Sequence, residues 1–220
     1  MSEGIEGVEG VRAVVWDFDG VLNRSGRLQS DGTYRWQRIA AEELGINALS
    51  MARAVFGRDK AALFTGKEDI LDRLANWARA EGVDLDPEDV LELWFEHDHD
   101  PDPELERVLG LLAEAGVVQV ILTNNEARRA RWIAQDAGWA EKVDAIFASG
   151  ETGAMKPAAE AFAQVETALD MAPGEILLVD DTPRNVEAAE KRGWLGWDYG
   201  PGGAMALVQA LMPLLLRARD

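Results

Sequence analysis

The stretch VRAVVWDFDG, residues 11–20, decides the fold of this chain. Its first part, Val11–Trp16, is rich in apolar and β-branched residues, which predicts a strand buried on both faces. Asp17 and Asp19 follow that strand directly, and Gly20 permits a sharp turn of the backbone. Because ligands bind at the carboxyl ends of the strands in an open parallel sheet, we expect the two carboxylates to lie at a functional site.

Apolar runs of the same kind recur in the second half of the chain. They predict further buried strands at Val117–Leu122, Ala145–Ala148 and Ile176–Val179. The amphipathic stretches around them predict helices, several of which begin with Pro or end at Gly: Pro103–Ala115, Glu126–Ala137, Pro157–Leu169 and Arg184–Arg192. Strands that alternate with helices indicate a parallel sheet with right-handed crossovers.

This alternation is interrupted after the first strand. Residues Tyr34–His97 are predicted to be helical throughout, between the polar, Gly- or Pro-rich linkers Asn23–Gly32 and His97–Pro103. The clearest helical segments are Tyr34–Leu44, Lys67–Glu81 and Pro87–Glu96. We therefore expect an α/β fold, in which a Rossmann-like parallel-sheet core (residues 1–23 and 100–220) carries an inserted all-helical cap (residues 24–99).

Composition excludes several classes of function. The formal net charge of −18 argues against a nucleic-acid partner, which needs basic patches. The absence of cysteine removes disulfides, thiolate metal sites and thiol nucleophiles. No apolar run approaches the roughly 20 residues of a membrane-spanning helix, and the acidic, Gly-rich N-terminus is unlike a signal peptide. We expect a cytoplasmic protein that acts on neither nucleic acid nor membrane.

Polar residues also follow the later predicted strands. These groups are Thr123-Asn124-Asn125, then Lys156-Pro157 in the loop after the third strand, and Asp180-Asp181-Thr182. With Asp17 and Asp19, the last group brings four carboxylates toward one site, where they repel each other unless a hard cation such as Mg²⁺ binds. Lys156, the Thr123 hydroxyl and the Asn124 backbone N–H are suited to phosphate oxygens. The pattern predicts a magnesium-dependent phosphoryl-transfer site.

These motifs resemble those of the haloacid dehalogenase (HAD)-like hydrolase superfamily, whose members are mostly phosphatases. The resemblance implies that Asp17 forms an aspartyl-phosphate and that Asp19 is the acid/base, with its backbone carbonyl on Mg²⁺. It further implies that Thr123, Asn124 and Lys156 hold the phosphoryl group. Asp181 is implied as the direct metal ligand, Asp180 as a ligand or a supporting partner, and Asn185 as a support of that loop. The helical insertion resembles the family's cap, and Asn23–Leu28 its flap.

The resemblance favours a phosphatase for a small phosphorylated metabolite, such as a sugar phosphate or a phosphoglycolate-like compound. Dehalogenases of the family lack an acid two residues after the nucleophile, whereas Asp19 is present here. A phosphomutase shares the Asp pair and stays an alternative. A non-enzymatic phospho-regulator is a further one, although its acidic residues would follow the strands in a different order.

Other residues are candidates for substrate contacts or for packing. Arg24, just after the first motif, can reach a phosphate or a sugar hydroxyl, and Lys60 and Lys67 have similar standing in the cap. We expect Trp36, Trp77 and Trp94 to pack within the cap, with a wall of the substrate pocket as the alternative. The polar run His97–Asp100 is expected to be solvated and not a second metal site. The apolar stretch Ala204–Leu216 covers the sheet edge or forms a dimer contact, so the chain is a monomer or a homodimer.

Overall fold

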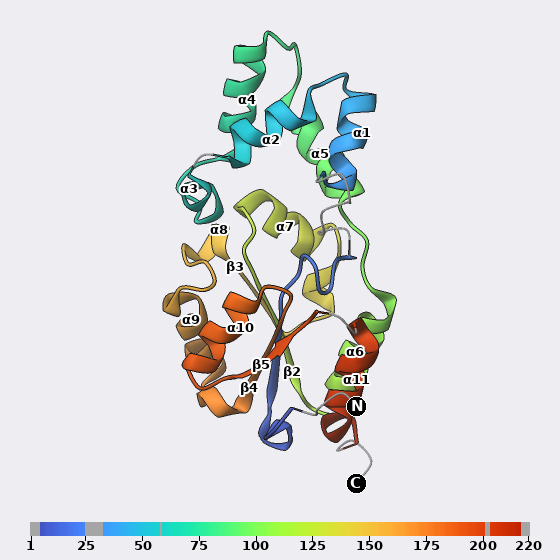
Figure 1. The fold of residues 1–220 in the computed structure, drawn as a ribbon, viewed down its shortest axis with the longest axis vertical. Helices are drawn as coiled ribbons and strands as arrows, with labels where there is room; N and C mark the ends of the chain where they lie inside the picture. The colour runs from blue at the N-terminus through green and yellow to red at the C-terminus, as the bar shows by residue number, and fades with distance from the viewer. Residues whose placement is uncertain (1–4, 25–32, 58, 201–202, 217–220) are drawn as a thin grey trace.

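A computed structural model describes residues 5–24, 33–57, 59–200 and 203–216. Its core is a five-stranded parallel sheet in the order β3-β2-β1-β4-β5 (Figure 1). The strands are β1 (Ala13–Trp16), β2 (Val118–Thr123), β3 (Ala145–Ala148), β4 (Ile176–Asp180) and β5 (Leu195–Asp198). The four predicted strands are present, and the central strand β1 pairs with β2 and β4.

The central strands are buried on both faces because helices cover both sides of the sheet. Successive side chains of a strand point to opposite faces, so Val14 and Val15 enter different cores. Val14 packs in a cluster with Leu207 and Leu211, whereas Val15 packs with Phe162 and Val165. Figure 1 shows α6 (Pro103–Glu114) and α11 (Gly203–Leu215) on one side and α9 (Ala159–Leu169) and α10 (Pro183–Lys191) on the other.

The C-terminal apolar stretch does not cover a sheet edge. Helix α11 packs beside α6, and its side chains Leu207, Leu211 and Leu214 are buried in the core cluster of one sheet face. The edges of the sheet are strands β3 and β5. The apolar side chains of this helix therefore complete a face of the core.

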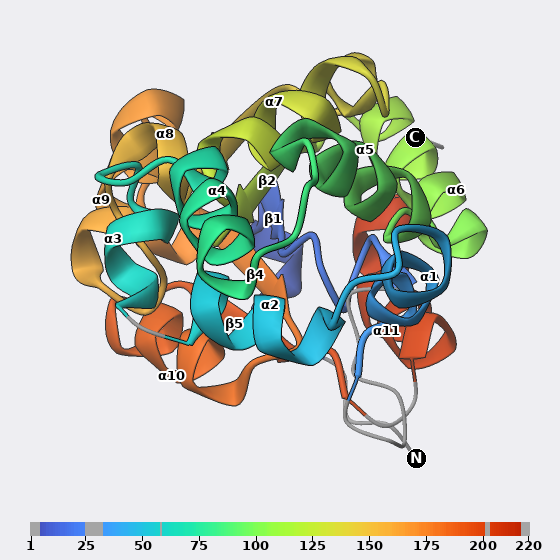
Figure 2. The same cartoon turned by 90° about the horizontal axis from the view of Figure 1, so that it is seen from above.

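The helical insertion forms a second hydrophobic cluster of its own. It comprises α1 (Arg35–Glu43), α2 (Ala48–Phe56), α3 (Lys60–Phe64), α4 (Ile70–Glu81) and α5 (Pro87–His97). Figure 2 shows these helices lying over the carboxyl ends of the strands. The predicted fold class, a Rossmann-like α/β core with an all-helical insertion, is confirmed. The expected flap and the first linker lie largely outside the described residues, since 25–32 are not among them.

Several elements differ from the sequence-based expectation. Strand β5 was not predicted, because its sequence LGWD is short and lacks a β-branched residue. A Cβ at Gly196 would lie 2.6 Å from Val186 Cγ1, so glycine lets this strand pass close under α10. Helix α9 begins at Ala159, two residues after the predicted start at Pro157.

Three short 3₁₀ helices and two further α-helices complete the part of the chain that the structure describes. They are η1 (Val8–Gly10), η3 (Trp139–Glu141), η4 (Pro173–Glu175), α7 (Ala127–Gln135) and α8 (Ser149–Thr152).

Among the helices that the structure describes, none combines the length and the apolar character that crossing a membrane requires.

Candidate active site

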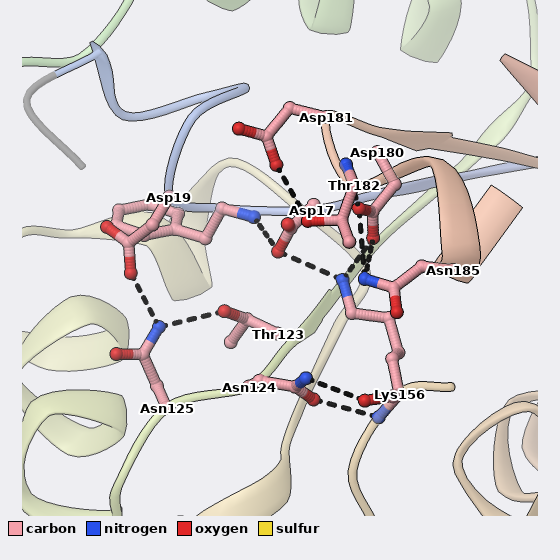
Figure 3. Close-up of polar contacts among 11 residues, drawn as sticks. Asp17, Asp19, Thr123, Asn124, Asn125, Lys156, Asp180, Asp181, Thr182 and Asn185 are labelled. Carbon is pink, nitrogen blue, oxygen red and sulfur yellow. Dashed lines mark hydrogen bonds and ion pairs between the residues drawn. The ribbon is translucent and has the colours of Figure 1, made fainter. Parts of the chain in front are cut away.

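The carboxyl ends of β1, β2 and β4 bring the predicted polar residues together (Figure 3). Trp16, the last residue of β1, is in register with Ile121 of β2 and Val179 of β4, so these strands end at nearly the same level. Asp17 continues the ladder, because its N–H donates to the Val179 carbonyl at 2.8 Å. The residues that follow each strand therefore face one another across a short distance.

Asp17 is a buried carboxylate beside a buried lysine. Lys156 Nζ lies 3.0 Å from Asp17 Oδ1 and 2.6 Å from Asp180 Oδ2. Burial raises the pKa of Asp17 to about 8, although the Lys156 charge opposes the shift and the charges of Asp180 and Asp181 add to it. In the absence of a metal ion, the folded protein therefore disfavours the ionised form of Asp17.

The acidic pair at the end of β4 consists of a fully buried carboxylate, Asp180, and a half-buried one, Asp181. Asp180 is 0% exposed and accepts hydrogen bonds from Asn185 Nδ2 (3.0 and 3.1 Å) and from the Thr182 N–H (2.8 Å). Asn185 lies in the first turn of α10 and holds this carboxylate in place. Asp181 is half-buried and faces the β1 loop (Figure 3).

Gly20 lets the β1 loop approach Asp181 closely. Its φ of 93° lies in the left-handed region, and a Cβ there would come within 2.0 Å of Asp181 Oδ2. Any larger residue would have to displace that carboxylate or the loop. The position of the Asp181 carboxylate therefore requires glycine at residue 20.

Carboxylate oxygens of Asp17, Asp180 and Asp181 all lie within 4.8 Å of one another, so this group can hold a metal ion. Three carboxylates without nitrogen or sulfur ligands fit a hard cation such as Mg²⁺. A cation here would also offset the repulsion that raises the pKa of Asp17. Sequence reasoning named all three residues as candidate metal ligands, together with Asp19.

The residues after β2 form hydrogen bonds that fix the neighbouring loops. The Asn124 side chain accepts from the Lys156 N–H (2.8 Å) and donates to the Lys156 carbonyl (2.9 Å). Asn125 Nδ2 donates both to Thr123 Oγ1 (2.8 Å) and to Asp19 Oδ2 (2.9 Å). Asn125 thus links two predicted site residues, a contact that the sequence did not indicate.

Asp19 lies against a fully buried arginine. Arg129 of α7 places Nη2 3.1 Å from Asp19 Oδ1, and Asn23 Nδ2 donates to the same oxygen at 2.8 Å. Burial disfavours the ionised form of Asp19, but Arg129 and the hydrogen bonds from Asn125 and Asn23 outweigh it and lower the pKa. The two acids of the first motif are therefore shifted in opposite directions.

Sequence reasoning missed Arg129, because the run Arg-Arg-Ala-Arg at residues 128–131 reads as a solvated helix face. The available signal was helical periodicity: Arg129 precedes the buried Ile133 by four residues and shares its face. Its Nε and Nη1 are buried and have no hydrogen-bond partner among the described residues. The faces of Trp94 and Phe95 cover the guanidinium instead, at 5.2 and 5.9 Å from the ring centroids.

The polar run His97–Asp100 at the end of the insertion was expected to be solvated, but its residue Asp98 is buried. Asp98 is 5% exposed, and its Oδ2 lies 3.1 Å from Arg129 Nη2 and accepts from Trp94 Nε1 at 3.1 Å. His99 packs edge-on against Trp132. Asn23 Nδ2 also donates to the Asp98 carbonyl at 2.7 Å. Asp98 thus connects the end of the insertion, through Arg129 and Asn23, to Asp19.

A cavity of about 270 Å³ opens between the insertion and the strand ends. From the core it is lined by Asp19, Asn124 and Asn125, and from the insertion by Tyr34, Trp36, Gln37, Ala52, Phe56, Lys60, Phe64, Trp94 and Asp98. Trp36 and Trp94 are buried in the insertion cluster and also form cavity wall, so both interpretations of these tryptophans hold. Trp77, by contrast, serves packing and donates to Ser50 Oγ.

The three cationic side chains proposed for substrate contacts, Arg24, Lys60 and Lys67, lie in different surroundings. Lys60 lines the cavity, whereas Lys67 is exposed and is not part of the cavity wall. Arg24 is half-exposed and pairs with Asp100 at 2.7 Å, so the structure does not bring it to the other site residues.

A family model described as haloacid dehalogenase-like hydrolase matches residues 11–193, which is most of the chain. The chain belongs to the HAD-like hydrolases. It is an enzyme of this hydrolase family, as the motifs predicted. A comparison with curated protein sequences found no significant match.

Solved structures share the fold of this HAD-like hydrolase. A protein from Porphyromonas gingivalis, described as a predicted HAD-like family hydrolase, is 20% identical, with a TM-score of 0.71 over 96% of this chain and 98% of that one. An aspartate-to-alanine mutant of a HAD family enzyme from Bacteroides thetaiotaomicron, in complex with magnesium and inorganic phosphate, is 16% identical with a TM-score of 0.71 over 87% and 95%. An L-2-haloacid dehalogenase from Xanthobacter autotrophicus is 20% identical with a TM-score of 0.61 over 94% and 86%.

An ion pair joins the helical insertion of this HAD-like hydrolase to its core. Arg128 of α7 donates through Nε and Nη2 to the two Asp69 carboxylate oxygens, at 2.9 and 2.8 Å. Both side chains are partly exposed, at 34% and 43%, so solvent screens the pair. Asp69 is also the N-cap of α4. The pair therefore ties the start of that helix to the core.

We expect a double-mutant cycle with Arg128→Gln and Asp69→Asn to give a coupling of about 0.2–1 kcal/mol, measured by urea unfolding and weakened by salt. Hydrogen exchange of the first α4 amides should also accelerate in Arg128→Gln, because the anchor of that end is removed. The exposed Glu187–Lys191 pair within α10 is the matched control. Its removal should leave α4 exchange unchanged. Zero coupling, with unchanged exchange, would mean that the pair does not anchor the insertion.

Proposed function

We propose that this enzyme is a Mg²⁺-dependent phosphatase that hydrolyses a small phosphomonoester through an aspartyl-phosphate on Asp17. The observation that supports it best is the pairing of two neighbouring carboxylates with opposite environments. Asp17 adjoins Lys156 and a metal-binding set of acids, whereas Asp19 adjoins Arg129 and two amides. Two acids whose pKa values are pushed apart can divide nucleophilic and acid/base work.

The proposed chemistry has two steps. An Asp17 oxygen attacks phosphorus and the bond to the leaving oxygen breaks, while Asp19 gives that oxygen a proton. Asp19 then takes a proton from a water molecule, which attacks phosphorus and releases phosphate with Asp17 restored. Because its pKa is lowered, Asp19 is ionised before substrate binds. The first proton therefore comes from solvent or from the substrate phosphate, whose second pKa is about 6.

The surrounding residues position the phosphoryl group in this proposal. Lys156 offers its ammonium, Thr123 its hydroxyl and Asn124 its backbone N–H to phosphate oxygens. Asp17, Asp180 and Asp181 would hold Mg²⁺. When bound, Mg²⁺ offsets the negative charge of the attacking carboxylate and of the phosphoryl oxygens. Asn185 and Thr182 keep Asp180 oriented.

The proposal is tested by measuring phosphate release from sugar phosphates, phosphoglycolate, nucleotides and phenyl phosphate. We expect release with Mg²⁺, loss of release in EDTA, and recovery when Mg²⁺ is added back in excess, because the three acids repel one another without a cation. The same samples are assayed for isomerised sugar phosphate and for halide release from L-2-haloacids. Isomer without free phosphate would indicate a mutase, and metal-independent halide release would indicate a dehalogenase.

A further inference from the structure

Aromatic rings form most of the apolar part of the wall of the cavity beside Asp19. The helical insertion contributes five of them from four separate segments: Tyr34, Trp36, Phe56, Phe64 and Trp94. Trp36 and Trp94 lie 5.3 Å apart at 34°, and Phe56 meets Trp94 at 5.4 Å and 73°. Phe64 continues the row at 6.4 Å from Phe56. These rings form a continuous apolar wall whose members hold one another in place.

The polar end of the cavity lies at the strand ends. Asp19, Asn124 and Asn125 line it there, next to the residues proposed to hold the phosphoryl group. A phosphomonoester bound with its phosphorus near Asp17 would therefore extend its leaving group along the aromatic wall. The cavity of about 270 Å³ exceeds the apolar cavity of about 150 Å³ that is sufficient for benzene. A single ring with a short linkage fits this space.

Charge around the wall disfavours a cationic leaving group, although aromatic rings can bind ammonium groups. The guanidinium of Arg129 already lies over the Trp94 ring, at 5.2 Å, and Lys60 lines the same cavity. The two carboxylates on the cavity, Asp19 and Asp98, both contact Arg129. A second cation would meet repulsion from Lys60, and the charges of Lys60 and Arg129 together already balance those of the two carboxylates.

We propose that this cavity binds the leaving group of the substrate and selects a planar, apolar ring in preference to a polyol. The proposal rests on the proposed phosphatase function, and it narrows the sugar phosphate or phosphoglycolate expected from sequence. Ring faces offer apolar contact to a planar group, whereas a sugar hydroxyl placed against them would give up its bonds to water for a surface that offers no strong hydrogen bond. The polar side chains that the insertion adds, such as Gln37 and Lys60, stand beside this row of rings and are not part of it. Specificity then resides in the row Trp36, Trp94, Phe56 and Phe64.

Phosphonates test the cavity without turnover. Binding of phenylphosphonate and of methylphosphonate to the Mg²⁺-loaded enzyme is measured by calorimetry. We expect the phenyl compound to bind at least about 10-fold more tightly, because it buries a ring against the wall. Equal affinities, or binding of neither compound, would overturn the proposal. Faster turnover of phosphocholine than of phenyl phosphate would do so as well.

A matched pair of variants on α2 locates the effect. Ala52 lines the cavity, whereas Ala54 on the same helix is exposed and lies outside it. Ala52→Leu should reduce the phenyl-to-methyl affinity ratio about 10-fold by occupying the ring space, and Ala54→Leu should leave the ratio unchanged. Phe64→Leu, at a half-buried position, is a second test should Ala52→Leu fold poorly. An unchanged ratio in the folded cavity variant would overturn the assignment.

The two proposals fail in distinguishable ways. Selective binding of phenylphosphonate, without phosphate release from any ester, would retain the ring site and reject the phosphatase. Phosphate release that is equally fast from phenyl phosphate and glycerol phosphate would retain the phosphatase and reject the ring site.

Discussion

Replacing Asp17 with Asn is expected to remove turnover and, in EDTA, to stabilise the protein at pH 8. The proposed nucleophile has no substitute, so kcat should fall by at least about 10⁴-fold. The stability gain has a separate cause. Burial, next to two further acids, raises the pKa of Asp17 to about 8, so ionising this group opposes folding in the absence of metal.

The pH dependence follows from the sign of that shift. The folded-state pKa of about 8 lies above the unfolded value near 4, so the folded protein binds more protons between these limits. Wild-type stability in EDTA should therefore fall as the pH rises from about 4 to 8, and Asp17→Asn should remove this contribution. Thermal unfolding across that range measures it.

Asp19→Asn supplies the contrast within the same motif. The pKa of Asp19 is lowered, so its ionised form stabilises the folded state and the variant should unfold more easily at neutral pH. Asp84→Asn, at an exposed position, should change neither stability nor turnover. If Asp17→Asn and Asp19→Asn shifted the unfolding temperature in the same direction, the opposite environments described for these two acids would be incorrect.

Replacing Arg129 with Met is expected to cause the largest loss of stability, about 3–5 kcal/mol in urea unfolding. The guanidinium is fully buried and contacts both Asp19 and Asp98, so its removal leaves two carboxylates without their cation. The exposed Arg131 of the same helix is the control, and Arg131→Met should cost less than about 1 kcal/mol.

A second substitution separates charge from packing at this position. In the background of Arg129→Met, Asp98→Asn should recover part of the stability, because it removes one of the uncompensated charges. Where the protein stays folded, Arg129→Met should lower kcat more than it raises KM, since Asp19 loses a contact that orients it. A loss below about 1 kcal/mol would show that the buried network does not hold the insertion to the core.

The sequence specified those parts of the fold that depend on local pattern. The strands β1 and β4 are recognisable because β1 is apolar throughout and β4 is apolar up to its last residue, Asp180, as a parallel sheet covered on both faces requires. Strand β5 lacks that pattern and is defined by its pairing with β4 and by the approach of α10 to Gly196. Its existence depends on tertiary contacts that a four-residue segment does not encode.

The residues of the candidate site were likewise predictable where local pattern identifies them, and not where tertiary contacts do. Residues that directly follow strands were found, because the ends of parallel strands meet at one edge of the sheet. Arg129 and Asp98 were missed, since each is polar and lies in a segment that reads as solvated. The difference between Lys60 and Lys67 also needed the structure, because it depends on how the insertion sits over the core.

Helix α7 has a consequence for how such enzymes can be recombined. By sequence it belongs to the core, yet three of its side chains serve the insertion: Arg128 holds Asp69, Arg129 lies against Trp94, and Trp132 packs on Phe95. The insertion therefore depends on side chains of the core helix α7 for part of its packing. A chimera that exchanged only the inserted helices would leave the buried guanidinium of Arg129 and the indole of Trp132 without these partners. The unit that can be transplanted between cores is the insertion together with the face of α7 that packs against it.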